Sequence, residues 1–279
     1  MRAGLRGTAA AALALALSTG VGCGSTGLGV VEGPDGAPDA EPPPDGDSPH
    51  LDGGGDARDA RKDGLAPASG YCLGLVPKPR FCDDFDDLDL INNWDQDTVT
   101  PPSVMDLDDS TFTSAPVSFG VATKSVLPGS SANVHLRKTV LGNVPHVQLS
   151  FSAIFASTTL TQGLVAIATL DVSSSHYFTL YLRDGDPDGA GALEELVGGT
   201  KTRHVLTKLP PAGTWTRITL DLDLAAGKAN VTFGAQKALD AAPITAIVGT
   251  EATVRLGAVY VYGPTDPFQA SFDDVVVDF

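Results

Sequence analysis

One stretch of the sequence carries acidic residues with the spacing of a calcium-binding loop. Asp184, Asp186 and Asp188 alternate with other residues, a glycine follows, and Glu195 comes after five more positions. This is the order D-x-D-x-D-G-x5-E. Calcium prefers hard oxygen ligands, here the three aspartates, the Ala190 carbonyl and Glu195. The spacing predicts a structural Ca²⁺ site; the alternative is an acidic hairpin turn in a chain rich in Asp and Gly.

The carboxylates of the C-terminal region lack the arrangement that glycosidases use. Such enzymes need two carboxyl groups flanking the bond they cleave. Residues 71–279 contain three glutamates, Glu194, Glu195 and Glu251, and adjacent residues of a strand point to opposite faces. The G-x-S-x-G motif of serine hydrolases is also missing from the sequence. These observations favour a protein without catalytic activity.

Aromatic side chains provide the candidate ligand-binding residues. Tyr177, Tyr181 and Arg183 fall on one face of an alternating stretch, and Trp94 lies in a polar segment between asparagines and aspartate. Aromatic rings can stack on the apolar faces of sugars. We expect these four residues to contact a ligand. The alternative is that the two tyrosines simply line an outer sheet face.

The N-terminus has the features of an export signal. Residues 1–22 combine Arg2 and Arg6 with an apolar run over 9–17 and a small-residue segment before Cys23. The run is shorter than the ~18–20 residues of a membrane-spanning helix. Small residues directly before a cysteine resemble the cleavage box of bacterial lipoproteins, although Gly20 stands where that box usually has Leu. The resemblance implies that Cys23 is lipidated and anchors the protein to the cell envelope, in the inner or outer membrane. The alternative is ordinary signal cleavage that leaves a free thiol.

Residues 23–70 have the composition of a disordered tether. Positions 24–70 contain 11 Gly, 7 Pro and 8 Asp and no aromatic residue. Such a segment cannot bury enough apolar surface to offset the entropy of ordering it. We expect an acidic, extended linker between the anchor and a folded domain; the alternative is a segment whose only role is solubility.

The two remaining cysteines predict a disulfide. Cys72 and Cys82 are ten positions apart in an exported chain, and Cys23 is assigned to the lipid. Closing this loop is worth about 2–3 kcal/mol in the chain-entropy account.

Charge excludes some classes of partner. The formal net charge is −16, from 18 basic and 34 acidic residues. Nucleic acids are bound by neutralising phosphates with Lys and Arg, so we expect no nucleic-acid partner. A basic patch for anionic lipids is equally disfavoured. The oligomeric state is not indicated by the sequence.

Periodicity predicts that residues 71–279 form one all-β domain. Apolar residues alternate with polar ones over 147–155, 176–183 and 215–224, the pattern of antiparallel sheets with one buried face. No amphipathic helix of three turns is present. Further strands are expected over 80–86, 117–123, 133–140, 164–171, 192–197, 229–233, 253–262 and 270–279. The fold class is therefore an antiparallel β-sandwich.

Three segments resemble the concanavalin A-like lectin/glucanase superfamily, which includes laminin-G-like jelly rolls. They are residues 80–86 (RFCDDFD), the pair 213–222 (GTWTRITLDL) and 228–234 (KANVTFG), and residues 270–279 (ASFDDVVVDF). The resemblance implies a jelly roll of two antiparallel sheets, with the last strand beside the first and a concave face that often receives carbohydrate.

The resemblance also implies candidate roles for two groups of residues. Polysaccharide lyases of this fold use Tyr and His with Arg nearby, which directs attention to His176, Tyr177 and Arg183, although the strand motifs of those enzymes are absent. Related modules often hold calcium between the first and last strands, where this chain has aspartates at 83, 84, 86, 87, 273, 274 and 278. We favour the alternative that these aspartates point outward and protect sheet edges.

Three functions remain open. The first is a lipid-anchored, non-catalytic module that recognises a glycan or a surface partner. The second is a divergent polysaccharide lyase or hydrolase, and the third is a passive envelope protein without a small ligand.

Overall fold

Strands form almost all of the regular structure. The computed structural model describes residues 70–87, 89–158, 162–184 and 191–279. The signal predicted for 1–22, Cys23 and the tether up to residue 69 lie outside these ranges. A short 3-10 helix, η1 (Tyr71–Gly74), precedes the strands β1 (Phe81–Asp83), β2 (Gln96–Val99), β3 (Val104–Asp108), β4 (Ser118–Thr123), β5 (Ser131–Val144), β6 (Val147–Phe155), β7 (Leu164–Ser173), β8 (His176–Asp184), β9 (Ala192–Val197), β10 (Thr200–Val205), β11 (Thr216–Asp223), β12 (Lys228–Phe233), β13 (Gln236–Pro243), β14 (Gly249–Tyr262) and β15 (Phe268–Asp278).

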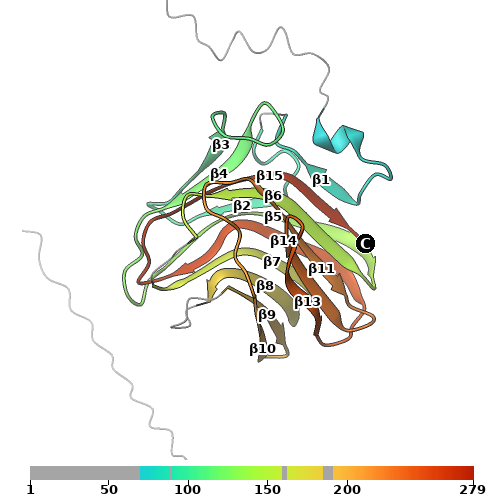
Figure 1. Cartoon of the computed structure of the whole chain (residues 1–279). Coiled ribbons are helices and arrows are strands. Elements are labelled where there is room, and N and C mark those ends of the chain that lie inside the picture. The colour runs from blue at the N-terminus through green and yellow to red at the C-terminus, as the bar shows by residue number, and fades with distance from the viewer. Residues whose placement is uncertain (1–69, 88, 159–161, 185–190) are drawn as a thin grey trace, which may run out of the picture. The chain divides into compact units, whose positions relative to one another are not determined.

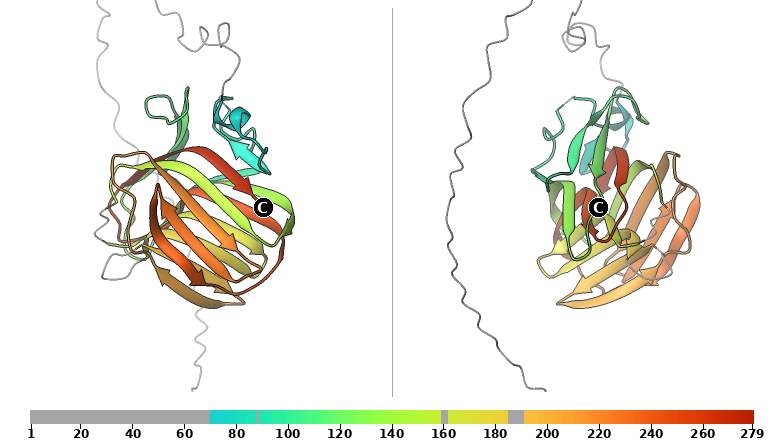
Figure 2. Two further views of the ribbon diagram at one scale, coloured as in Figure 1. Left: turned by 45° about the vertical axis from the view of Figure 1, so that its right-hand side comes forward. Right: turned by 90° about the vertical axis from the view of Figure 1, so that its left-hand side faces the viewer.

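Two antiparallel sheets make up the domain (Figure 1). The eight-stranded sheet has the order β13-β12-β11-β6-β15-β4-β3, with β1 also paired to β15. The seven-stranded sheet has the order β10-β9-β8-β7-β14-β5-β2. The two views in Figure 2 show the sheets as curved layers stacked on each other. The predicted all-β sandwich is therefore confirmed.

The alternating pattern of the sequence produces the core between the sheets. In β11, Ile218, Leu220 and Leu222 are at most 1% exposed, while the residues between them face away from the core. The same period places Leu149 and Phe151 of β6 directly opposite Leu220 and Ile218. Burying a side chain of this size stabilises the fold by about 1.5–3 kcal/mol. The described residues include no helix long enough and apolar enough to cross a membrane.

The first and last strands pair, as the resemblance implies. Phe81 of β1 lies opposite Val277 of β15, and the register continues through Asp83. Cys72 and Cys82 form the predicted disulfide, with their Cα atoms 5.7 Å apart. The bond joins η1 to β1 and thereby fixes the start of the domain against its last strand.

Candidate functional site

A hollow of about 600 Å³ lies on the outer face of the seven-stranded sheet. Its lining comes from β5, β7, β8, β9, β10 and β14, together with the turn between β7 and β8. We call this surface the groove; its lining includes His135, Asp171, Tyr177, Tyr181, Glu194, Lys201, Arg255 and Tyr260. It combines aromatic rings with charged and hydroxyl groups, which is the composition of a site for a polar ligand.

Strand alternation brings two of the predicted tyrosines into the groove. In β8, Phe178 and Leu180 are fully buried in the core, so Tyr177 and Tyr181 point to the opposite face. Tyr181 is 8% exposed and packs against Ala166 at the base of the groove. Burial, and next the nearby Glu194, raise the pKa of the Tyr181 phenol well above its ordinary value of 10. The Tyr181 hydroxyl therefore stays protonated and can only hydrogen-bond.

A β-bulge adds an aromatic residue that sequence reasoning did not assign to the site. Between Ala258 and Val261 the register of β14 against β5 shifts, so that two residues, Val259 and Tyr260, face the partner position of Asn133. A bulge re-aims side chains in this way, and all three of these residues line the groove. The only signal in the sequence is a Tyr-x-Tyr pair that interrupts an apolar run.

The Tyr260 ring stacks with a second exposed aromatic ring. Tyr260 and Tyr262 are 38% and 41% exposed, and their rings stack with centroids 6.2 Å apart and planes 15° apart. The pair forms a flat aromatic surface at one side of the groove. Such a surface suits the apolar face of a sugar ring.

The charged groups that line the groove are paired with each other. Arg255 Nη1 lies 2.9 Å from one oxygen of Asp171 and 3.1 Å from the other. Lys201 Nζ lies 2.9 Å from Glu194 Oε1. Burial raises the pKa of Asp171 above its ordinary 3.8, although Arg255 opposes that rise. Each cation of the lining is thus matched by a carboxylate.

His135 is a neutral member of the groove. Burial, and then the charges of Arg255 and Arg137, lower its pKa from 6.5 to about 4. The imidazole is therefore uncharged at neutral pH. Its Nδ1 is buried and has no hydrogen-bond partner among the described residues.

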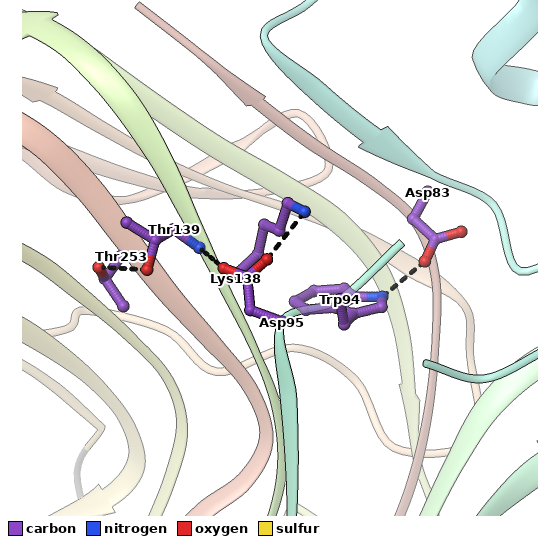
Figure 3. A network of polar contacts seen from close by, with 6 residues as sticks. All are labelled: Asp83, Trp94, Asp95, Lys138, Thr139 and Thr253. Carbon is purple, nitrogen blue, oxygen red and sulfur yellow. Dashed lines mark hydrogen bonds and ion pairs between the residues drawn. The ribbon is translucent and has the colours of Figure 1, made fainter. Parts of the chain in front are cut away.

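Two other predicted ligand residues lie elsewhere. Arg183 is 8% exposed and lies beyond the lining of the groove. Trp94 is 6% exposed, and its Nε1 donates to Asp83 Oδ2 (Figure 3). Its ring packs edge-on against Phe81 and stacks with Phe85. The expectation that Trp94 contacts a ligand is corrected: the indole belongs to the core, where one buried carboxylate satisfies its only polar group.

Two of the predicted calcium ligands, Asp184 and Glu195, lie far apart. Asp186, Asp188 and Ala190 lie outside the described residues, as does the side chain of Asp184. In the β8–β9 pairing Glu195 is opposite Phe178, six positions before Asp184, which is about 20 Å along a strand. Glu195 therefore cannot share an ion with Asp184, and this part of the prediction is wrong.

Glu195 instead belongs to a buried pair. Its Oε1 accepts a hydrogen bond from the Thr245 backbone N–H (2.7 Å) and lies 2.8 Å from His176 Nε2. The side chains of His176 and Glu195 are 1% and 2% exposed. His176 faces the core, whereas the adjacent Tyr177 faces the groove, so the two cannot act together on one substrate.

Three of the seven aspartates around β1 and β15 are buried, contrary to the expectation that they point outward, whereas Asp84, Asp86 and Asp278 are half-buried and Asp87 is exposed. Asp83, Asp273 and Asp274 are at most 4% exposed. Asp273 accepts hydrogen bonds from the backbone N–H groups of Thr113 and Ser114. Burial raises the pKa of both Asp83 and Asp273 from 3.8 to about 6. Within the described ranges no three His, Cys, Asp or Glu residues are placed to hold a metal ion.

Comparisons with known proteins identify the fold. No family model and no curated protein sequence matches this chain. An endo-β-1,4-glucuronan lyase from the fungus Trichoderma reesei is similar in structure, with 13% identity and a TM-score of 0.50 over 72% of this chain and 95% of the lyase. The cellulose-induced protein Cip1 is similar with 11% identity and a TM-score of 0.52 over 71% of this chain and 96% of Cip1. At these identities the likeness shows a shared sandwich fold.

Proposed function

We propose that this chain is a non-catalytic, glycan-binding module of the cell envelope with a concanavalin A-like fold. The observation that carries the proposal is the open groove whose aromatic surface comes from Tyr177, Tyr181 and Tyr260. A tyrosine ring offers a flat apolar face and a polar hydroxyl. Those two features match the CH faces and hydroxyl groups of a sugar.

Fold analogy supports the same ligand class. One structure of similar fold is named as a lyase of a β-1,4-linked glucuronan, which is a polysaccharide. One fold hosts many functions, so the analogy carries less weight than the groove itself.

The electrostatics of the groove support binding without turnover. A lyase needs a base that removes a proton and a cation that stabilises the charge formed on the substrate. Here Arg255 is engaged by Asp171, and the raised pKa of Tyr181 disfavours its phenolate. The lowered pKa of His135, about 4, makes its neutral ring a weak base.

A lyase is the second candidate, because His135, Tyr177 and Arg255 do share the groove. Elimination from a uronan leaves an unsaturated product that absorbs ultraviolet light. Incubation with glucuronan and with other uronans measures this directly. A steady rise in absorbance that His135→Ala abolishes would establish the enzyme and overturn the binding-only proposal.

The binding proposal is tested on a glycan array, followed by calorimetry with the best glycan. We expect Tyr177→Ala and Tyr260→Ala each to weaken binding by about tenfold, equivalent to about 1.4 kcal/mol. Tyr71→Ala is the matched control, because Tyr71 packs against Arg217, on the other sheet. Binding to no glycan by the folded wild type, or equal losses in all three variants, would contradict the proposal.

The envelope location rests on Cys23 and the tether and has its own test. We propose that a lipid at Cys23 anchors the module and that residues 24–70 hold it away from the membrane. Labelled fatty acid fed to expressing bacteria should enter the wild type and not Cys23→Ala. Absence of label from the wild type would remove the anchor and leave the groove untouched.

A further inference from the structure

We propose that the groove selects neutral glycans over uronic-acid glycans, and that Asp171 is the residue that sets this preference by holding Arg255. The inference rests on the proposed function, since it names the chemical class of the glycan. It depends on how the two lining cations are engaged.

Sheet register fixes the first pair. Arg255 of β14 lies directly opposite Thr169 of β7, and Asp171 lies two residues further along β7. A long side chain reaches such a diagonal neighbour. Arg255 Nη1 contacts both carboxylate oxygens of Asp171, at 2.9 and 3.1 Å, and donates to Thr169 Oγ1 at 3.2 Å. These contacts hold the Arg255 guanidinium across β7.

The second pair repeats the diagonal arrangement at the other side of the groove. Lys201 of β10 is opposite Leu196 of β9, and Glu194 lies two residues further along β9. The Lys201 ammonium lies 2.9 Å from Glu194 Oε1. Its side chain is 61% exposed and that of Glu194 is 16% exposed, so this pair is the looser of the two.

Among the described residues, none of the lining besides Arg255 and Lys201 supplies a positive charge. His135 is neutral above its lowered pKa of about 4. Arg137 is on the same strand but does not line the groove; its charge acts from outside the lining, on His135 and Asp171 as well as on Asp95. The whole chain carries a formal charge of −16. A polyanionic glycan is therefore repelled at long range and meets no uncommitted cation within the lining.

Neutral sugars face no such obstacle. Their hydroxyl groups can donate to Asp171 or Glu194 and accept from Arg255 without separating either ion pair. A uronate carboxylate would have to displace Asp171 from Arg255 and would leave that carboxylate partly buried without its cation. The groove thus discriminates by an unfavourable contact with the wrong ligand, which is a common basis of specificity.

The test uses pairs of oligosaccharides that differ only at C6. Cellohexaose is paired with β-1,4-linked hexaglucuronate, and β-1,4-mannohexaose with β-1,4-linked hexamannuronate. Calorimetry at low salt on the full chain should show at least about tenfold tighter binding of the neutral member. Asp171→Asn should free Arg255 and shift the neutral-to-acidic affinity ratio by about tenfold or more toward the uronate. High salt should cancel that shift.

Asp240→Asn is the matched control. Asp240 forms an exposed ion pair with Lys237 at 2.7 Å on β13 of the other sheet, so the variant makes the same change in net charge away from the groove. An unchanged affinity ratio in this variant supports the inference, and a shift equal to that of Asp171→Asn overturns it. Circular dichroism melting of each variant verifies folding.

The outcomes separate this inference from the proposed function. Wild type that binds a uronate as tightly as its neutral partner overturns the inference and keeps the glycan-binding function. A wild type that binds none of the four hexasaccharides counts against the proposed function for these glycans. In that case uronate binding gained by Asp171→Asn still supports the inference, and continued absence of binding overturns it.

Discussion

Replacing Asp86 with asparagine should stabilise the protein at neutral pH. Asp86 follows β1 and lies among the carboxylates of Asp83, Asp84, Asp273 and Asp274, all of which raise its pKa. One of its carboxylate oxygens is buried and has no hydrogen-bond partner among the described residues. Asparagine keeps the size of the side chain and removes the charge.

The size of the effect follows from the pKa of Asp86. Burial, and then the neighbouring carboxylates, raise that pKa from 3.8 to about 7. A rise of this size corresponds to about 4 kcal/mol if none of it is screened. Asp86 is partly exposed, so solvent screening reduces the gain to about 1–2 kcal/mol. For a domain of this length the midpoint of thermal unfolding should increase by about 2–8 °C.

The raised pKa of Asp86 makes the stability of the protein fall as the pH rises. A carboxyl group with a raised folded pKa stays protonated in the folded protein while the unfolded chain ionises. Its contribution is therefore favourable below pH 3.8 and is lost as the pH rises to about 7. Asp83 and Asp273, each with a pKa of about 6, act in the same direction. The wild type should become less stable from about pH 4 to pH 7, and Asp86→Asn should reduce that decline.

Thermal melting followed by circular dichroism at both ends of this pH range measures the effect. A gain in Asp86→Asn that is equal at acidic and neutral pH would show that charge is not the cause. A loss at neutral pH would refute the reasoning outright. Melts with millimolar calcium and with chelator complete the assay, because calcium that stabilises wild type but not Asp86→Asn would mean that the carboxylates serve as ligands.

Two further substitutions test the core and the groove. His176→Ala leaves Glu195 buried without its side-chain partner, so urea unfolding should show a free energy of unfolding lower by about 2–4 kcal/mol. His146, which is exposed, provides the control. A loss no larger than that of His146→Ala would contradict the role of the buried pair. Gly257→Ala places a Cβ 2.4 Å from a backbone carbonyl at a φ of +131°, and should cost about 1–3 kcal/mol and weaken glycan binding through the bulge. Gly74→Ala meets nothing within 4 Å and should be neutral, so equal stability of the two glycine variants would argue against the steric account.

The sequence predicts central strands better than edge strands. The range 147–155 matches β6 and 192–197 matches β9, because a central strand alternates between core and outer face. The strands that were not predicted, β2, β3, β10 and β13, are the outermost strands of the two sheets. β2 and β10 contain no fully buried residue, so no apolar period marks them. Edge strands exist because a neighbour supplies hydrogen bonds, and a single sequence does not show the neighbour.

The sequence indicates which residues share a face of one strand, but not which residues of different strands meet in the groove. Tyr177 and Tyr181 share a face of β8, and that face was visible in the sequence. Tyr260 reaches the groove through a register shift between β14 and its partners, which no local pattern encodes. Trp94 has polar neighbours in the sequence, yet its partner, Asp83, is eleven positions away.

Pairing of β1 with β15 has a practical consequence for handling the protein (Figure 1). The two strands lie side by side in the eight-stranded sheet, whereas the groove opens on the outer face of the other sheet. An affinity tag or a surface linkage introduced beside either strand would leave the groove open to solution. A short peptide joining the two strands, with new ends cut at the exposed turn around Ala226, should give a circularly permuted scaffold for engineering the groove.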